Sequence, residues 1–244
     1  MRIAPDVHML VGVGPAPVYL LVSDKELTLI DSGMVGQTDK VIAEIEKAGY
    51  AASALKTIVL THYHHDHVGC AAELASLTGA RIAAHRDEVV YITRKKSLPA
   101  SSLLQRLLFW LFDPVLLWIL DPADETFIAE VDLPLEEGDE IETFDGLQVI
   151  HVPGHTPGSI ALHHPARQML FCGDAITNRR EIRYSPRHVS TDSSQALDSA
   201  CRMASFPVET ACFGHGTPIL EQAGARIKEA MEQHCNQSAR ESET

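Results

Sequence analysis

A short apolar run, Thr57-Ile58-Val59-Leu60, leads directly into the polar segment Thr61-His62-Tyr63-His64-His65-Asp66-His67. An apolar run of this length that contains β-branched residues predicts a buried strand. The loop that follows it contains four side chains able to bind a metal ion: His62, His64, Asp66 and His67. Imidazole nitrogen and carboxylate oxygen both suit zinc, at roughly 2.0–2.2 Å. This spacing therefore predicts a metal-binding loop at one edge of a sheet.

Three further ligand-type residues each follow a glycine at the end of an expected strand: His155, Asp174 and His215. The strands expected before them cover 147–152, 168–172 and 209–213. A single histidine or aspartate in a turn is usually structural. Four strand ends that carry such residues in one chain indicate instead that all of them serve one metal site.

The order of the expected elements favours two sheets with helices outside them over one doubly wound sheet. Strands are expected in five parts of the chain: 7–30, 57–60, 81–84, 140–172 and 209–213. The clearest expected helices cover 38–48, 71–78, 193–204 and 220–231. The chain has 244 residues, 45% of them hydrophobic, which excludes a disordered chain and predicts a single domain over 1–235. The polar segment 236–244 is expected to be a disordered tail.

The pattern His62-x-His64-x-Asp66-His67, followed by His155, Asp174 and His215, resembles the metal signature of the metallo-β-lactamase superfamily. The resemblance implies an α/β (α+β) fold, the four-layer αββα metallo-β-lactamase sandwich, with the metals at one edge between the two sheets. It also implies two Zn²⁺ per chain, with Fe or Mn as alternatives. The implied ligands of the first metal are His62, His64 and His155. Those of the second are Asp66, His67 and His215. Asp174 would bridge both metals, and Asp31 would be a structural acid beside the site.

This resemblance implies a dinuclear metal-dependent hydrolase that uses a metal-bridging hydroxide to cleave an ester, thioester or lactone bond. Two metals about 3.5–4 Å apart can share one water and lower its pKa toward neutrality. No catalytic Ser or Cys is then required, and no Ser-His-Asp or Cys-His arrangement is evident in the sequence. Asp66 is the candidate catalytic residue, because a ligand beside the hydroxide could pass its proton to the leaving group.

Two alternatives to this reaction stay open. The first is a phosphodiester or phosphotriester hydrolase with the same metal centre. The second is a mononuclear iron persulfide dioxygenase, which would keep His62, His155 and Asp174 as ligands. A scaffold without catalysis is disfavoured, because no ligand of the signature is missing.

Particular branches of the superfamily fit less well. True zinc β-lactamases lack a bridging Asp at the position of Asp174. Glyoxalase II carries a helical C-terminal domain that binds glutathione, whereas 29 residues (216–244) follow His215 here. Acyl-homoserine lactonases share all seven ligands but carry a Tyr shortly after the bridging Asp, where this chain has Ala175-Ile176-Thr177-Asn178. The sequence is most similar to the small bacterial metallo-hydrolases, with a lactonase-like or glyoxalase II-like metal site.

Charge and cysteine content indicate the partners and the compartment. With 20 Lys and Arg against 33 Asp and Glu, the net charge is −13, and the basic runs Arg94-Lys95-Lys96 and Arg179-Arg180 are short. A nucleic-acid partner is therefore not expected, since binding phosphates needs clustered cations. The expected partner is a small-molecule substrate with an apolar part. Five cysteines without a C-x-x-C pair predict no disulfide framework, and the N-terminus has no apolar leader, so a reducing, cytoplasmic location is expected.

An apolar insert at 98–122 stands apart from the expected metal-binding framework. Its centre, Leu103–Leu120, contains both tryptophans of the chain. Arg106 and Asp113-Pro114 interrupt it, so two short helices are expected and no transmembrane segment. A helix that is apolar on all sides needs a partner, a ligand or a buried position. We expect paired helices that line the substrate cleft or form a homodimer interface; core packing and attachment to a membrane surface are the alternatives.

Replacing Phe109, Trp110 and Phe112 of this insert with Ser tests the expectation. The change should raise KM for long-chain substrates or dissociate a dimer, because it removes apolar contact area, while metal content stays unchanged. Steady-state kinetics, light scattering and elemental analysis measure the three quantities. Unchanged kinetics and unchanged assembly in a folded variant would refute both roles.

Overall fold

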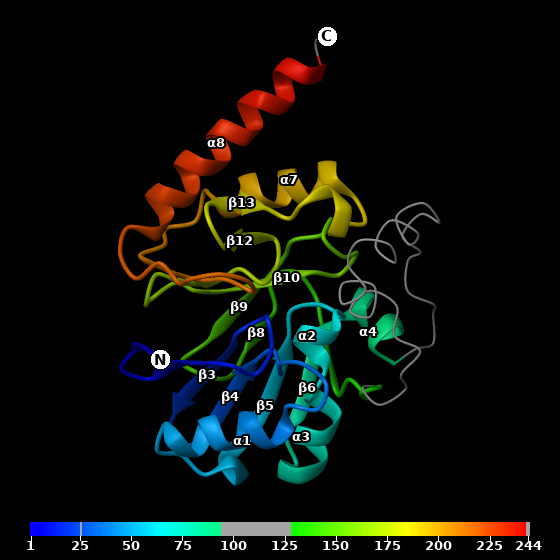
Figure 1. Cartoon of the computed structure of the whole chain (residues 1–244), viewed down its shortest axis with the longest axis vertical. Helices are drawn as coiled ribbons and strands as arrows, with labels where there is room; N and C mark the ends of the chain where they lie inside the picture. Colours follow the sequence, from blue (N-terminus) through cyan, green and yellow to red (C-terminus); the bar gives the residue numbers. More distant parts are fainter. Residues whose placement is uncertain (25, 94–127, 243–244) are drawn as a thin grey trace. The chain divides into compact units, whose positions relative to one another are not determined.

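The computed structural model describes residues 1–24, 26–93 and 128–242 of the chain (Figure 1). The chain divides into two compact units, Met1–Pro134 and Leu135–Thr244. The apolar insert predicted at 98–122 lies outside the described residues, as does the basic run Arg94-Lys95-Lys96.

The first unit is built on a seven-stranded sheet in the order β1-β2-β3-β4-β5-β6-β7. Strands β1 to β4 pair antiparallel, whereas β4, β5 and β6 run parallel to one another. The strands are β1 (Arg2–Ala4), β2 (Val7–Leu10), β3 (Val18–Ser23), β4 (Glu26–Ile30), β5 (Leu55–Leu60), β6 (Arg81–His85) and β7 (Leu133–Leu135). The helices are α1 (Thr38–Lys47), the 3-10 turn η1 (Ala52–Ala54), α2 (His65–Val68), α3 (Ala71–Thr78) and α4 (Arg86–Ile92).

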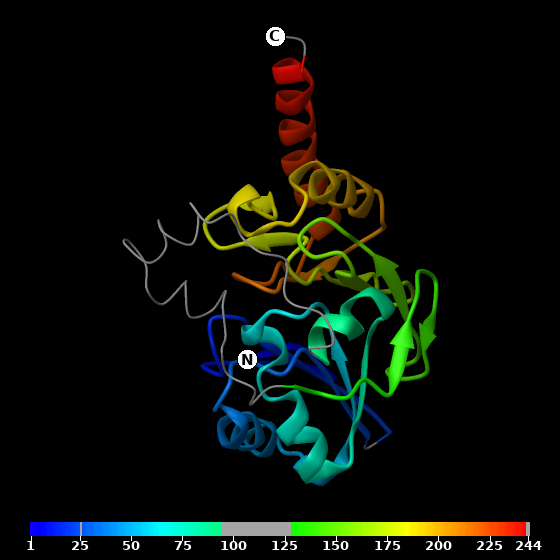
Figure 2. The same cartoon turned by 90° about the vertical axis from the view of Figure 1, so that its right-hand side faces the viewer.

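Helices α1 and α3 lie side by side on one face of this sheet (Figures 1 and 2). Val41 and Ile45 of α1 and Leu74 of α3 are buried in the same core cluster as Leu29 and Ile58 of the sheet. This packing holds β4, β5 and β6 in place. Because the three strands are parallel, their carboxyl ends meet at one edge, where the predicted metal-binding loop begins.

The second unit contains a five-stranded sheet in the order β14-β11-β10-β9-β8 and a separate hairpin of β12 and β13. Strands β11 and β14 run parallel, so their carboxyl ends also meet at one edge. The strands are β8 (Glu140–Ile141), β9 (Leu147–His151), β10 (Ile160–His164), β11 (Met169–Phe171), β12 (Ile176–Asn178), β13 (Ile182–Tyr184) and β14 (Thr210–Cys212). The helices are the 3-10 turn η3 (Arg187–Val189), α7 (Ser193–Met203) and α8 (Ala223–Ser242).

The core of the second unit lies between its sheet and helices α7 and α8. Ala200 and Met203 of α7 and Ile227 of α8 are buried with Ile150 and Leu170 of the sheet. The second half of α8 extends beyond the other elements of this unit in both views (Figures 1 and 2). Each unit therefore combines a sheet with helices, which confirms the prediction of two sheets.

Helix α8 corrects the prediction for the C-terminal segment. It continues to Ser242, through most of the 236–244 segment that was expected to be a disordered tail. The segment is polar, but it contains Gln, Ala, Arg and Glu, which favour a helix that has already been nucleated. Among the described residues, no helix is both long and apolar enough to cross a membrane.

The cysteines correct a second expectation. Cys201 of α7 is disulfide-bonded, whereas Cys70, Cys172 and Cys212 are free and buried. The absence of a C-x-x-C pair therefore did not exclude a disulfide, because the bond depends on which cysteines the fold brings within reach of each other.

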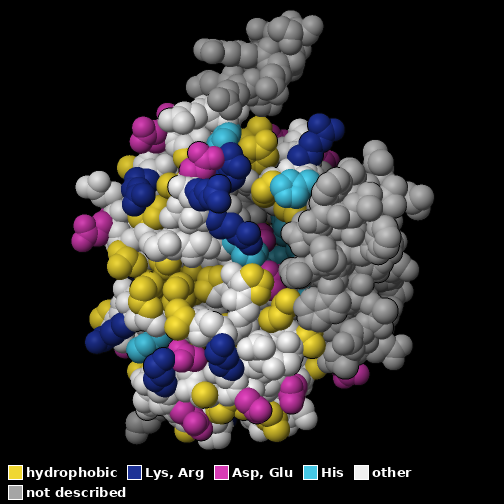
Figure 3. Space-filling model, in the orientation of Figure 1, with side chains coloured by type: hydrophobic (Ala, Val, Ile, Leu, Met, Phe, Trp, Pro, Cys, Tyr) yellow, Lys and Arg dark blue, Asp and Glu magenta, His cyan; other side chains and the backbone are white. Residues whose placement is uncertain are grey.

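The charged surface agrees with the composition. On the face drawn in Figure 3, the Lys and Arg side chains of the described residues are interspersed with Asp and Glu side chains.

His163 of β10 makes the stability of the second unit depend on pH. The residue is 3% exposed, and its ring meets Phe206 edge-to-face at 5.1 Å between centroids. Burial lowers the pKa of His163 below its usual value of about 6.5. The unfolded chain therefore takes up a proton at a pH where the folded chain does not, and stability falls as the pH drops through about 6.5.

We expect the Tm of His163→Leu to fall less than the Tm of the wild type when the pH is lowered from about 7 to about 5. Thermal unfolding across this range measures the slope. His188→Leu is the control, because His188 is exposed and its replacement should leave the slope unchanged. An unaltered slope in the His163 variant would show that this residue does not cause the pH dependence.

Candidate metal centre

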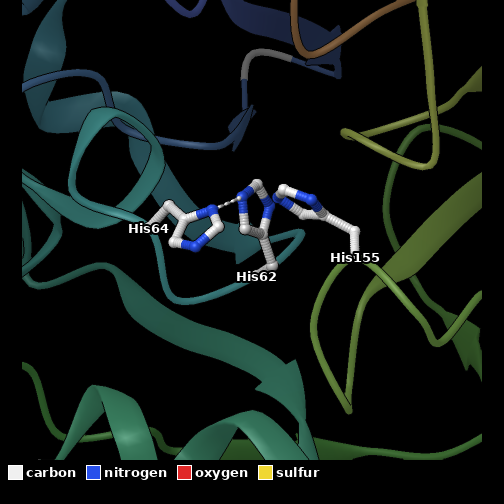
Figure 4. A group of neighbouring side chains, drawn as sticks. All are labelled: His62, His64 and His155. Atoms are coloured by element: carbon white, nitrogen blue, oxygen red, sulfur yellow. Dashed lines mark hydrogen bonds between the residues drawn. The ribbon is translucent and has the colours of Figure 1, made fainter. Parts of the chain in front are cut away.

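The first unit brings four of the predicted ligands together after β5. His62 and His64 lie in the loop, and Asp66 and His67 lie in the single turn of α2 that follows. His62 Nε2 is 3.0 Å from His64 Nδ1, the hydrogen bond dashed in Figure 4, and the Nε2 of His67 is 3.9 Å from Asp66 Oδ2. Two ligand atoms on one tetrahedral metal at 2.0–2.2 Å are roughly 3.3–3.6 Å apart. The two observed separations fall on either side of this range, so small side-chain shifts would bring each pair onto one metal.

Asp31, at the carboxyl end of β4, organises this loop. Its carboxylate accepts hydrogen bonds from the main-chain N–H of Thr61 at 2.8 Å and from the Thr61 hydroxyl at 3.0 Å. Its Oδ2 is 2.7 Å from His67 Nδ1. The ring of His67 therefore donates from Nδ1, and its Nε2 is left as the metal-binding nitrogen. Asp31 holds these contacts with φ +61°, a left-handed conformation that is uncommon for a residue with a side chain.

Tyr63, between His62 and His64, is buried and stays a neutral phenol. Burial raises its pKa far above the usual value, and the negative charge of Glu88 raises it further. The main-chain N–H of Tyr63 donates to the Glu88 carboxylate at 2.7 Å. Tyr63 is therefore a supporting residue of the loop and does not supply a phenolate ligand.

The second unit brings the other three ligands together around one carboxylate. Asp174 Oδ2 is 3.2 Å from His215 Nε2 and 3.6 Å from His155 Nε2. Two imidazole nitrogens that face the same carboxylate oxygen form the arrangement that a bridging carboxylate needs. The neighbouring Gly214 is required, because a Cβ there would collide with the Asp174 carboxylate.

Contacts at Nδ1 orient the rings of the two predicted ligands His155 and His215. His155 Nδ1 is 2.7 Å from the Ser185 hydroxyl, and His155 itself lies in the loop drawn at the right of Figure 4. Arg179 donates to His215 Nδ1 at 2.9 Å. A guanidinium can only donate, so the proton of the neutral His215 ring is on Nε2 in this arrangement. Binding a metal at Nε2 requires the other tautomer, and Arg179 must then turn away from Nδ1.

The described residues thus bring the predicted ligands together as two sets. The first set is His62, His64, Asp66 and His67. The second is His155, Asp174 and His215. The sequence alone did not indicate the contacts of Ser185, Arg179 and Glu88. Arg179 belongs to the short basic run Arg179-Arg180, and its position five residues after Asp174 was a signal that could have been used.

The family assignment follows from comparison with known proteins. The model of the metallo-beta-lactamase superfamily matches residues 11–215. The chain belongs to this superfamily. The "Probable metallo-hydrolase YflN" of Bacillus subtilis (strain 168) is 27% identical over 225 residues, which cover 84% of this chain and 81% of that protein. The resemblance drawn from the seven ligands is thereby confirmed.

A second group of relatives in the superfamily is named for a specific hydrolysis. The hydroxyacylglutathione hydrolase of Pseudomonas aeruginosa (strain LESB58) is 33% identical over 162 residues, or 65% of this chain. The match covers 46% of that relative, so the chain spans less than half of its length.

Solved structures of the superfamily share the fold. A metallo-beta-lactamase family protein from Thermus thermophilus matches with a TM-score of 0.73 and 23% identity, over 98% of this chain and 81% of the other. The subclass B3 metallo-beta-lactamase BJP-1 of Bradyrhizobium japonicum matches with a TM-score of 0.68 and 18% identity, over 99% and 94%. These matches confirm the predicted α/β metallo-β-lactamase fold. At this level of identity they carry no information on substrate.

The contacts of Asp31 predict a role in metal affinity. We expect Asp31→Asn to bind zinc roughly 10- to 100-fold more weakly, because the amide no longer accepts from His67 Nδ1 as a carboxylate does. Competition with a chromogenic chelator measures the affinity.

Asp145→Asn is the matched control for this variant. Asp145 has the same left-handed backbone conformation, with φ +62°, but its side chain is exposed and pairs with Arg167. It should bind zinc as the wild type does. Wild-type affinity in Asp31→Asn as well would contradict the role assigned to Asp31.

Proposed function

We propose that the chain is a zinc-dependent dinuclear hydrolase that cleaves an ester, thioester or lactone bond. The observation that carries the proposal is the carboxylate of Asp174, whose Oδ2 is faced by the Nε2 atoms of both His155 and His215. In this proposal the two ligand sets join in one centre. His62, His64 and His155 hold one metal, Asp66, His67 and His215 hold the other, and Asp174 bridges them. Membership of the superfamily supports this assignment.

The chemistry of the donor set fits zinc. Five imidazoles and two carboxylates are a nitrogen-rich set, which zinc and iron both accept. His67 and His155 have contacts at Nδ1 that direct Nε2 to the metal side of the ring, and His62 Nδ1 is likewise 3.0 Å from the Thr61 hydroxyl. Such contacts fix the tautomer and orientation that a metal ligand needs. Fe or Mn remains an alternative to zinc within the proposal.

The residues of the chain have distinct roles in the proposed reaction. When bound, the metal ions supply an activated water and polarise the scissile carbonyl. Asp66, which is 5% exposed, takes up the proton that the attacking water loses and returns it to the leaving group. While this proton moves, Asp31 keeps the proton of His67 on Nδ1, so that its Nε2 remains the metal-binding nitrogen. No side chain forms a covalent bond to the substrate in this scheme.

Among the three bond types, a thioester is the leading candidate for the substrate. The support is the 33% identity to a hydroxyacylglutathione hydrolase, and that similarity covers 65% of this chain. We propose a small molecule with an apolar part as the partner of the site. A cytoplasmic location stays a proposal, and the disulfide of Cys201 argues against the reducing compartment on which it was based.

Metal analysis and a substrate panel test the proposal. The zinc-loaded wild type should hold two metals per chain and hydrolyse a thioester, lactone or ester, and a chelator should abolish the activity. Asp174→Ala should lower metal content and hydrolysis together, because it removes a ligand of both metals. Elemental analysis and release of the thiol or acid are the measurements.

The control is Asp198→Ala, an exposed position on α7 of the same unit, which should leave both quantities unchanged. One metal per saturated chain would contradict the dinuclear centre. One iron per chain together with oxygen uptake would indicate a persulfide dioxygenase instead of a hydrolase. Hydrolysis of phosphoesters alone would indicate a phosphodiester or phosphotriester hydrolase.

A further inference from the structure

We infer that Glu88 is a positioning residue for the metal-binding loop, and that its buried carboxylate fixes the backbone between the ligands His62 and His64. Nothing in the ligand signature of the superfamily includes this residue. The inference rests on the proposed function, because the role exists only if His62 and His64 bind a metal.

The burial of Glu88 is the first observation. Its side chain is on the first turn of α4 and is 0% exposed. A fully buried carboxylate is rare in proteins, because desolvation of the charge is unfavourable unless the group is paired or hydrogen-bonded. Main-chain N–H groups in the first turn of a helix favour a negative side chain there. The chain therefore tolerates the charge, but its position inside the unit still calls for a specific partner.

One such partner is the backbone of the metal-binding loop. Glu88 Oε2 accepts a hydrogen bond from the main-chain N–H of Tyr63 at 2.7 Å. This N–H belongs to the peptide that joins His62 to Tyr63. Because a peptide is planar, a restraint on its N–H fixes ψ of His62 and φ of Tyr63 together. These two angles are among those that set how the His62 and His64 side chains leave the backbone toward each other.

Helix α4 makes a second contact with the metal-binding loop, through Tyr91. Tyr91 lies three residues after Glu88, on the same side of α4, and its ring is 4.9 Å from the ring of Tyr63. The ring of Tyr63 in turn meets that of His64 edge-to-face, at 4.9 Å and 77°. Helix α4 thus holds the backbone of the loop through Glu88 and the ring beside His64 through Tyr91. Both contacts converge on the residue between the two ligands.

Asp132 offers a comparison within the first unit for the backbone hydrogen bond alone, because its side chain is exposed whereas that of Glu88 is buried. Its Oδ2 accepts from the main-chain N–H of Ile82 at 2.8 Å, so it makes the same kind of bond to the backbone of β6. No ligand of the proposed centre lies beside Ile82. A carboxylate that only supports the fold should behave like Asp132, whereas one that positions ligands should alter metal affinity.

The experiment measures zinc affinity of the full chain by competition with a chromogenic chelator. Glu88→Gln keeps an oxygen within reach of the Tyr63 N–H and should bind zinc within about threefold of the wild type. Glu88→Asp keeps the charge but withdraws the carboxylate by one methylene, and it should bind roughly 10-fold more weakly. Glu88→Ala should lose roughly 10- to 100-fold, the range for residues that orient metal ligands. Asp132→Ala should bind zinc as the wild type does.

Amide hydrogen exchange by NMR gives a second readout that does not depend on metal. The Tyr63 N–H should be protected in the wild type and in Glu88→Gln, and it should exchange faster in Glu88→Asp. If Glu88→Ala does not fold, the contrast between Gln and Asp still decides the question.

The outcomes separate the two proposals. A wild type that binds no zinc would overturn the proposed function, and this inference with it. A wild type that binds zinc while Glu88→Asp and Glu88→Ala bind it equally well would overturn the inference alone. Weaker binding in Asp132→Ala by the same factor would also overturn it, because the effect would then be general destabilisation.

Discussion

The hydrogen bonds of Asp31 connect the architecture of the first unit to its chemistry. Asp31 directly follows β4 and Thr61 directly follows β5, and the two strands are parallel neighbours. The carboxylate therefore reaches the first residue beyond the next strand, and it also reaches the ring of His67, which lies 36 residues further along the chain. If these strands were antiparallel, the two ends would lie at opposite edges of the sheet. The orientation of the His67 ring thus depends on the parallel pairing of two buried strands.

The second unit uses the same principle with different residues. Its parallel pair, β11 and β14, ends close to Asp174 and His215. Asp174 faces the Nε2 atoms of two histidines, one of which is held at Nδ1 by Ser185. In both units the strand ends carry the ligands, and contacts at Nδ1 orient them. A rigid support of this kind reduces the reorganisation needed when a metal binds.

The family is set by the shared framework of the fold, whereas the substrate depends on parts of the chain that vary, and the reason is physical. Ligands at strand ends are set by the sheets, which all members of the fold share. Substrate contacts come from loops and insertions, which vary independently of the sheets. In this chain the most distinctive sequence of that kind is the apolar segment at 98–122. The metal set therefore supports a hydrolytic reaction class, whereas the identity of the acyl or leaving group depends on parts outside the shared framework.

The sequence alone predicted the candidate ligands and the strands that carry them, and it indicated the superfamily, because an apolar run followed by His, Asp or Gly is a local pattern. It also predicted a helix near Thr38 and its end before Gly49, where α1 is observed. Only the tertiary structure decided which residues support the ligands. Glu88 meets Tyr63 across 25 residues of chain, Ser185 meets His155 across 30, and the disulfide of Cys201 has no local signal. Such contacts depend on how strands and helices pack, and a side chain 25 or more positions away leaves no mark on the pattern around the residue that it holds.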